Sequence, residues 1–416
     1  MTDLPVILFL VGAGFAFYIV AGYPLLLAVL AWFAPKPVNK RFTEKSVTIL
    51  LAVYNGEKWI RAKIESILRL NYPRSRMQIL VVSDGSTDQT DDMVAEFQPE
   101  GVELLRVPHG GKALALNAGM ARATGEILFF TDVRQQLEPG ALRHLVACLG
   151  DPSVGGASGQ IVFLKAQKGA YLAPPYRRET PLTKSGAGRP VLRSSSEAEG
   201  GGEADVGLYW RFEKWLRDEL TMVGSLPVAT GCIYAVRGEL ARPLPADALV
   251  DDAYQPLAVI FQGYRFVFER NAVAYDYPTQ LAMEFQRKVR TLAGLFQIIR
   301  SYPRLLNVFT GLGFHFFSYK LGRLLLPYAL ILVALNSFWL PYPWAKIAIA
   351  AQLLLYGLAA VDHWVPAKSV LKRLSAVCCA FAVLMGASLC AGAILFVPAG
   401  RLWKRTRVKA AVESGN

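Results

Sequence analysis

The sequence predicts an α/β protein whose doubly wound, mostly parallel sheet is flanked by transmembrane helices. Three observations lead to this prediction: 53% of the 416 residues are hydrophobic, only 19% are charged, and β-forming runs alternate with helix-length segments between two apolar ends. A soluble protein of this length is normally more polar. Strands that alternate with helices at short spacing indicate parallel strands joined by helical crossovers.

The amino-terminal segment is long and apolar enough to cross a membrane. Residues 4–34 carry no charge, and at about 1.5 Å per residue they exceed the roughly 30 Å of a bilayer's hydrocarbon core. No basic residue precedes them, unlike the start of a secretory signal peptide. We therefore expect residues 1–35 to form a retained transmembrane anchor.

Apolar residues return towards the carboxyl end, where we expect transmembrane segments within 324–398. The apolar blocks lie at about 324–340, 344–361 and 375–397. Lysines and arginines flank the apolar segments, residues 399–416 form a basic tail, and the formal net charge is +13. This placement favours anionic lipid headgroups over nucleic acid as the partner, and a cytoplasmic central domain. We expect a multi-pass protein of a bacterial inner membrane.

The number of crossings is left open by the same charge rule. Three crossings after a cytoplasmic domain would place the basic tail outside. Either the tail is an exception, or one block is re-entrant, or residues 309–323 take part in a crossing.

The middle of the chain alternates between strands and helices. Expected strands are 47–54, 77–84, 102–107 and 126–132. Expected helices are 57–70, 87–97, 111–123 and 138–149. Residues 165–207, rich in proline, glycine and serine, break this alternation and are expected to form a mobile loop insertion.

Aspartates end two of the expected strands. Asp84 in VVSDGSTDQT and Asp132 in LFFTDVRQ each close a β-forming run, and Asp251 and Asp252 follow later in the chain. In an open α/β sheet, ligands bind beyond the carboxyl ends of the strands. Asp84 and Asp132 should therefore face one crevice, which the later pair could face too.

Six segments occur in an order that resembles a known family: LAVYNGEKWI, SDGSTDQT, GGKALALNAG, FFTDVRQ, the Asp251–Asp252 pair and RKVR at 287–290. Together, over about residues 45–300, they resemble membrane-anchored inverting family 2 glycosyltransferases with a GT-A fold, such as synthases of bacterial exopolysaccharides, chitin-type oligomers and hyaluronan. The resemblance implies a catalytic domain over 45–280. It also implies transfer of a sugar from a nucleotide-diphosphate donor to a lipid-linked or growing glycan acceptor, in company with other exopolysaccharide-assembly proteins.

The resemblance assigns donor contacts to several residues. Asp84 resembles the aspartate that contacts the nucleoside, together with residues after the first strand: Ala52, Tyr54 and Glu57. A carboxylate can accept a hydrogen bond from the uracil imide, which favours a uridine donor. Lys112 and Asn117 resemble the family's donor-binding lysine and asparagine, and Lys112 could meet phosphate at a helix start.

A nucleotide-sugar leaves as a diphosphate, which needs its charge held rather than a proton. Asp132 is therefore expected to bind Mg²⁺ or Mn²⁺ that bridges the diphosphate. Relatives usually carry Asp-x-Asp here, whereas this chain has Asp132-Val133-Arg134. Either Arg134 contacts the phosphate, or Asp132 and water hold the metal.

An inverting transfer also needs a base on the acceptor side, and the resemblance gives this role to Asp252. Asp251 would orient it or cap the following helix. Which of the two is the base stays open, because adjacent helical positions face different ways. Thr230 and Gly231 resemble the acceptor-side loop, and Trp215 is either core or an acceptor contact.

Residues 281–323 are expected to form amphipathic interfacial helices, the first of which lies on the inner leaflet. Arg287 and Arg290 share the polar side of that helix, and Arg290 is expected to clamp the diphosphate. Processive relatives carry Gln-x-x-Arg-Trp here, but this chain has Arg287 in place of the glutamine and Thr291 in place of the tryptophan. Two alternatives to single transfer remain: a processive synthase that extrudes its polymer, and a non-catalytic membrane subunit with a degenerate site.

Overall fold

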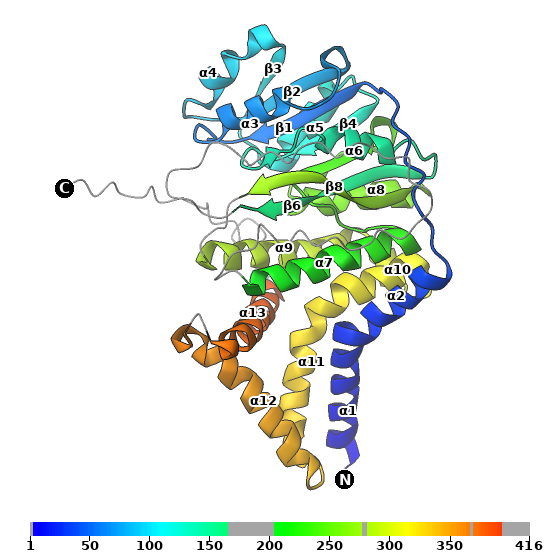
Figure 1. Ribbon diagram of the computed structural model, residues 1–416, viewed down its shortest axis with the longest axis vertical. Helices are drawn as coiled ribbons and strands as arrows, with labels where there is room; N and C mark the ends of the chain where they lie inside the picture. The colour runs from blue at the N-terminus through cyan, green and yellow to red at the C-terminus, as the bar shows by residue number, and fades with distance from the viewer. Residues whose placement is uncertain (1–2, 165–203, 277–280, 367–368, 393–416) are drawn as a thin grey trace, which may run out of the picture.

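The computed structural model describes residues 3–164, 204–276, 281–366 and 369–392. In Figure 1 a sheet with its covering helices lies above two long helices, and apolar helices extend away on the far side of those two. Residues 165–203 of the expected loop insertion 165–207 lie outside the described residues, as does the whole expected basic tail, 399–416. Residues 204–207 are described and are helical, not part of a loop.

Among the described residues the sheet has eight strands in the order β3-β2-β1-β4-β7-β6-β8-β5. Their bounds are β1 Val47–Val53, β2 Met77–Asp84, β3 Val102–Val107, β4 Ile127–Thr131, β5 Gln136–Leu137, β6 Val154–Phe163, β7 Ile233–Arg237 and β8 Arg265–Asp276. β3, β2, β1 and β4 run parallel, and β7 is antiparallel to both β4 and β6. The expected parallel half is confirmed, and the antiparallel strand β7 is an addition to it.

Side chains of β1 alternate between two apolar cores, as a strand with both faces covered requires. Ile49 and Leu51 pack with α3 (Ile60–Leu68) and α6 (Ala141–Cys148). Leu50 packs on the opposite face, in a core that includes α5 (Lys112–Arg122) and α8 (Asp251–Phe261). The short helix α4 (Thr90–Ala95) lies between β2 and β3 in sequence.

Two long helices, α7 (Ala204–Val223) and α9 (Leu281–Ser301), lie between the sheet and the apolar helices (Figure 1). The apolar face of α9 packs against the domain: Ala293, Leu295 and Ile298 are buried in the same core as α8. Gly294 lies so close to Val250 that an added Cβ would be 2.7 Å from its side chain. Around Gly294 this face is therefore covered by Val250, the residue before α8, while the placement of α9 at the inner leaflet stays a prediction.

Within the described residues, four helical runs are long and apolar enough to cross a membrane: Leu4–Phe33, Gly311–Trp339, Trp344–Trp364 and Leu371–Ala391. They contain α1 (Asp3–Phe17), α2 (Tyr23–Phe33), α10 (Gly311–Phe316), α11 (Gly322–Asn336), α12 (Trp344–Val361) and α13 (Val370–Ala391). Many of their large apolar side chains are exposed, which suits a lipid environment. The helical run passes the expected boundary at residue 323 without a break.

Candidate active site

The site forms where the parallel strands β1, β2 and β4 end at one edge of the sheet. Asp84 is the last residue of β2, and Asp132 directly follows β4. Helices α5 and α8 begin at the same edge with Lys112 and Asp251. The salt bridges described below join residues from β4, α5 and α8 there.

Asp84 is buried, with 3% of its surface exposed. Its carboxylate accepts hydrogen bonds from the backbone N–H groups of Gly110 and Gly111, at 2.8 Å and 3.0 Å. Gly111 has a φ of 97°, a conformation that suits glycine. Asp84 thus fixes the loop from which Lys112 and α5 begin.

An aromatic shelf lies beside that loop. The rings of Tyr54 and His109 stack with centroids 4.3 Å apart and an angle of 28° between their planes. His109 is also 3.0 Å from the Asp84 carboxylate. Tyr54, for which the sequence predicts a donor contact, therefore meets the Asp84 loop through a histidine that the sequence reasoning missed.

The first βα loop is tied to the DGSTD segment by polar contacts. Asn55, with a φ of 50°, accepts a hydrogen bond from the Thr87 N–H at 2.8 Å. Asp88 accepts one from the Glu57 N–H at 3.1 Å and one from the Thr90 N–H at 3.0 Å. This places Ala52, Tyr54 and Glu57 beside the Asp84 motif.

Lys112 joins the two acidic parts of the site. Its Nζ lies 2.8 Å from Asp132 Oδ1 and 2.9 Å from Asp251 Oδ1. Burial alone would lower the pKa of Lys112, but the charges of Asp132 and Asp251 outweigh it and the pKa is raised. The lysine therefore stays protonated and holds one carboxylate from β4 against one from α8.

The aspartate pair at the start of α8 is divided by its contacts. Asp251 is engaged: besides Lys112, it accepts a hydrogen bond from the Tyr234 hydroxyl at 3.2 Å. For the Asp252 carboxylate no hydrogen bond is found among the described residues. Burial and the charge of Asp251 raise its pKa to about 6, although Lys112 opposes the shift. The Asp252 carboxylate therefore binds a proton more readily than that of an ordinary aspartate.

Asp132 is 35% exposed and sits on a turn with a buried polar base. Lys63, 1% exposed, donates to Thr131 Oγ1 and to the Gln135 carbonyl oxygen, both at 2.6 Å. Burial lowers the pKa of Lys63 to about 7. Arg134, for which a phosphate contact is expected, instead pairs with the buried carboxylate of Asp276, which also accepts from the Gln135 amide at 2.8 Å.

The residues present fit a divalent cation of the kind that keeps waters and substrate oxygens as ligands. No group of three or more candidate side-chain ligands occurs in the described part of the chain. Mg²⁺ is commonly held by one or two carboxylates together with substrate phosphates and water. Asp132, which already faces a cation in Lys112, can serve as that carboxylate.

Asn117 lies on the buried side of α5 and makes two backbone contacts. Its amide nitrogen donates to the Leu244 carbonyl at 2.8 Å, and its oxygen accepts from the Leu244 N–H at 2.7 Å. The residue thereby fastens α5 to the segment that leads to the aspartate pair. The donor contact expected for Asn117 stays a prediction.

The acceptor-side loop predicted at Thr230 and Gly231 lies against Asp252. A Cβ added at Gly231 would be 3.2 Å from Asp252 Oδ2. The Thr230 hydroxyl donates to the Gly159 carbonyl and accepts from Arg217, at 2.7 Å in both cases. Gly231 thus leaves the room in which the Asp252 carboxylate sits.

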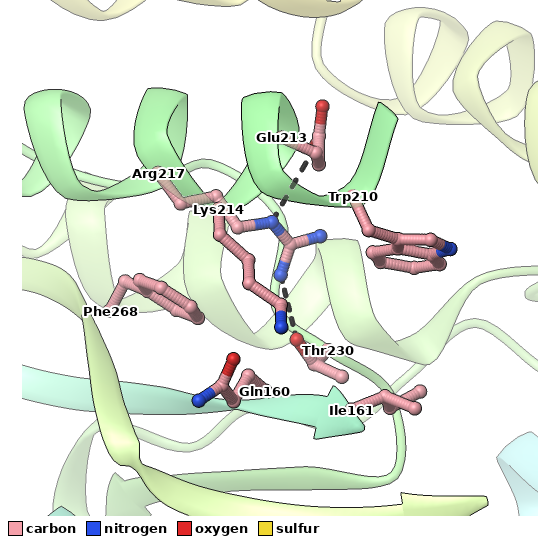
Figure 2. A pocket seen from close by; sticks show the side chains of 8 residues that line it. All are labelled: Gln160, Ile161, Trp210, Glu213, Lys214, Arg217, Thr230 and Phe268. Atoms are coloured by element: carbon pink, nitrogen blue, oxygen red, sulfur yellow. Dashed lines mark hydrogen bonds and ion pairs between the residues drawn. The ribbon is translucent and has the colours of Figure 1, made fainter. Parts of the chain in front are cut away.

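A small pocket, with room for little more than one water molecule, opens beside Thr230 (Figure 2). It is lined by Gln160, Ile161, Trp210, Glu213, Lys214, Arg217, Thr230 and Phe268. Figure 2 shows Arg217 of α7 reaching Thr230 across the pocket, with the indole of Trp210 at its side. Trp215 does not line it; this residue packs on the core, with its ring 5.8 Å from that of Phe212.

Beside the pocket an ionic cluster joins α7 to the helical run 311–339. The buried Glu213 carboxylate pairs with Arg323 at 2.8 Å, lies 3.7 Å from Lys320, and accepts from the Tyr319 hydroxyl. Burial would raise the pKa of Glu213, but the cations outweigh it and hold the pKa well below its usual range.

Residues 48–185 match the family model described as Glycosyl transferase family 2. The chain contains a family 2 glycosyltransferase domain. A probable glycosyltransferase, YdaM of Bacillus subtilis, is 31% identical over 129 residues, which are 29% of this chain and 31% of that protein. The poly-beta-1,6-N-acetyl-D-glucosamine synthase of Staphylococcus epidermidis is 28% identical over 138 residues, 30% of this chain and 32% of the relative. The chain thus spans about a third of the length of these curated relatives.

A solved structure shares the fold over most of the chain. The mannosyltransferase PcManGT of Pyrobaculum calidifontis, in complex with GDP-Man and Mn²⁺, superposes with a TM-score of 0.61. The two are 21% identical, and the match covers 92% of this chain and 97% of that one. The family 2 domain therefore has the expected GT-A-like fold.

Several of the residues predicted for the site lie close together in the structure. Asp132, Lys112 and the aspartate pair form one cluster, with Gly231 against it. Arg287 and Arg290 lie on α9, which supports the segment before Asp251: the Gln297 side chain accepts from the Leu249 N–H at 3.0 Å. The sequence reasoning missed Lys63, His109, Tyr234 and Trp210.

Proposed function

We propose that this protein is an inverting family 2 glycosyltransferase that moves a sugar from a nucleotide-diphosphate donor to a glycan or lipid-linked acceptor at a membrane surface. The observation that carries the proposal is the Lys112 ammonium held between Asp132 and Asp251, with Asp252 beside them. Such a cluster offers both requirements of the reaction: a cation for the departing diphosphate and a basic carboxylate for the acceptor.

Donor binding is assigned to the edge formed by β1, β2 and the start of α5. Asp84 with its loop, and the Tyr54–His109 shelf, would receive the nucleoside, and Lys112 would meet the diphosphate at the amino end of α5. Asp132 would hold Mg²⁺ or Mn²⁺, which supplies positive charge to the leaving phosphate oxygens. Ala52, Glu57 and Asn117 would shape this side of the site, and Arg290 or Arg287 would reach it from α9.

Transfer is assigned to Asp252. As the acceptor oxygen bonds to the anomeric carbon, the Asp252 carboxylate takes the hydroxyl proton, while the bond between that carbon and the phosphate oxygen breaks and its electrons stay on the diphosphate. Asp251 is unsuited to this role because Lys112 and Tyr234 already use its oxygens. Attack opposite the leaving group inverts the configuration.

The acceptor would bind over the mouth of the small pocket beside Thr230. The Oε1 atom of Gln160, which lines the pocket, is buried, has no hydrogen-bond partner among the described residues and can accept from a sugar hydroxyl. The indole of Trp210 offers an apolar face to a ring. Trp210 thus replaces Trp215 as the proposed aromatic contact, next to Thr230 and Gly231.

The membrane side is assigned from charge. The four candidate spans and the basic residues near them support a domain on the cytoplasmic face of a bacterial inner membrane. A cysteine introduced by Ser195→Cys should react with a membrane-impermeant reagent only in permeabilised cells. Labelling in intact cells would place the domain on the other side.

The function is tested with the purified full-length protein in nanodiscs of anionic lipid. UDP-sugars and GDP-sugars are offered with Mn²⁺ and a lipid extract, and release of the nucleoside diphosphate and the size of the product are measured. One donor should turn over with the wild type and with Asp247→Asn, which alters an exposed residue just before the pair. Asp252→Asn should slow it about 100-fold or more. Absence of turnover with every donor, or equal rates in both variants, would overturn the proposal.

Product size separates the two catalytic modes in the same experiment. Release of one nucleoside diphosphate for each acceptor, with a product longer by one sugar, is expected. A ladder of long products would instead identify a processive synthase.

A further inference from the structure

Lys63 is the most deeply buried lysine near the site, and the mechanism above does not use it. It lies on α3 among Ile60, Ile64 and Ile67, all of them fully buried. Taking an ammonium out of water is costly unless its environment compensates. A methionine could fill this position without that desolvation cost.

The contacts of Lys63 indicate its structural role. Its Nζ donates to Thr131 Oγ1 and to the Gln135 carbonyl oxygen, 2.6 Å away in both cases. Thr131 ends β4 and Gln135 directly precedes β5. Only the residues 132–134 lie between these two contacts. One amine thus closes the base of the three-residue turn that presents Asp132.

The same contact continues towards the acceptor side. The Thr131 hydroxyl, which accepts from Lys63, donates to the Cys232 carbonyl oxygen at 2.8 Å. Cys232 follows Gly231, whose Cα faces the Asp252 carboxylate. A chain of two hydrogen bonds therefore runs from Lys63 through the end of β4 to the loop that bounds the catalytic base.

We propose that Lys63 is a positioning residue that holds the turn bearing Asp132 and the loop Thr230–Cys232 at a fixed separation, and so sets the distance between donor diphosphate and acceptor hydroxyl. This inference rests on the proposed function. Such control matters because an error of about 1 Å between reacting groups can lower a rate about 100-fold.

Neighbouring contacts hold the outer part of the turn. Arg134 and the Gln135 amide both reach Asp276, at the end of β8, which is 1% exposed. The turn is therefore held from two sides, by Lys63 from α3 and by Asp276 from β8. Asp132 is left to face the site, where it meets Lys112.

The test compares Lys63→Met and Thr131→Val, alone and together, in full-length protein in nanodiscs. The probe is UDP or GDP, whichever the wild type binds with Mn²⁺, measured by calorimetry, together with kcat, the KM values and the Mn²⁺ concentration for half-maximal rate. Each single variant should lower kcat by 10- to 100-fold and raise the Mn²⁺ requirement several-fold, with the acceptor KM nearly unchanged. The double variant should be no worse than Lys63→Met, because both changes break one chain of contacts.

Two variants separate this role from general packing. Ser66→Ala removes hydrogen bonds to the Lys63 carbonyl and from the Leu137 N–H on the same buried helix face, and should keep wild-type kcat. Thr131→Ser keeps the hydroxyl and should therefore have most of the activity that Thr131→Val loses. Comparison of these two variants still tests the inference if Lys63→Met fails to fold.

Wild-type kcat and Mn²⁺ dependence in both Lys63→Met and Thr131→Val would overturn the inference, as would losses that simply add in the double variant. These results would leave the proposed function standing. Failure of the wild type to bind either nucleotide would overturn the proposed function, and this inference with it.

Discussion

The pH dependence of transfer follows from the environment of Asp252. Burial and the charge of Asp251 raise its pKa from the ordinary 3.8 to about 6. With that pKa, roughly one carboxyl in eleven is ionised at pH 5 and about ten in eleven at pH 7. An aspartate with the ordinary pKa would be more than about nine-tenths ionised at pH 5. Since only the ionised form can take the acceptor proton, kcat/KM should fall about tenfold per pH unit below pH 6.

The fall in kcat/KM below pH 6 is the acid limb of the pH profile. Neighbouring charges predict how variants shift this acid limb. Asp251→Asn removes a negative charge that raises the pKa of Asp252, so the limb should shift to lower pH. Lys112→Met removes a positive charge that lowers it, so the limb should shift to higher pH, along with a loss of donor binding. Asp252→Asn should abolish the limb and lower the rate about 100-fold or more.

The assay is the initial rate of nucleoside diphosphate release from pH 4.5 to 8 in nanodiscs, with calorimetry to confirm that the donor nucleotide still binds. Persistence of the acid limb in Asp252→Asn would refute the assignment of the base. A limb that moves upward in Asp251→Asn would refute the electrostatic reasoning.

The same shift has a consequence for stability. A carboxyl whose pKa is raised in the folded state favours folding most below its unfolded pKa, and that contribution is lost as the pH rises through about 6. A shift of about two units corresponds to at most about 3 kcal/mol. Asp252→Asn should therefore melt at a higher temperature than the wild type at pH 8, and at nearly the same temperature at pH 4. A wild type that melts at the same temperature as Asp252→Asn at pH 8, or at a higher one, would contradict this reasoning.

Three further predictions concern the rest of the site. Asp132→Asn should raise the Mn²⁺ concentration for half-maximal rate at least several-fold, and Val133→Ala should leave it unchanged; an unchanged response in the Asn variant would show that another group binds the ion. Gly231→Ala, whose Cβ would lie 3.2 Å from Asp252 Oδ2, should lower kcat about tenfold or more, whereas Gly224→Ala, with nothing within 4 Å, should not. Trp210→Ala should raise the acceptor KM with little change in nucleotide affinity, and an unchanged acceptor KM would remove it from the acceptor site.

The positions that the sequence predicts best are those at strand ends. Asp84 and Asp132 each follow a buried run, and parallel strands bring such residues to one edge whatever the distance between them in sequence. Lys63 carried a usable signal, because it occupies the same helical face as Ile60 and Ile64, where a solvated lysine would not be expected.

Other contacts could not be foreseen, since they join distant segments. Arg134 meets Asp276, 142 residues away, because β5 pairs with the end of β8. The apolar face of α9 meets Val250 for a similar reason: a helical pattern shows that a face will be covered, but does not show by what. In the same way the sequence does not distinguish Trp210 from Trp215 as an aromatic contact for the acceptor. Only the placement of α7 shows which of them lines the pocket.

The Glu213 cluster fixes the position of the pocket relative to a candidate membrane span. Because Arg323 and Lys320 belong to a candidate membrane span and Glu213 to the helix that lines the pocket, the floor of the pocket cannot rise or sink independently of that span. An acceptor hydroxyl must then stand at one level above the lipid to meet Asp252. A lipid-linked acceptor would then need a spacer long enough to reach this level, and acceptors with shorter spacers would be excluded.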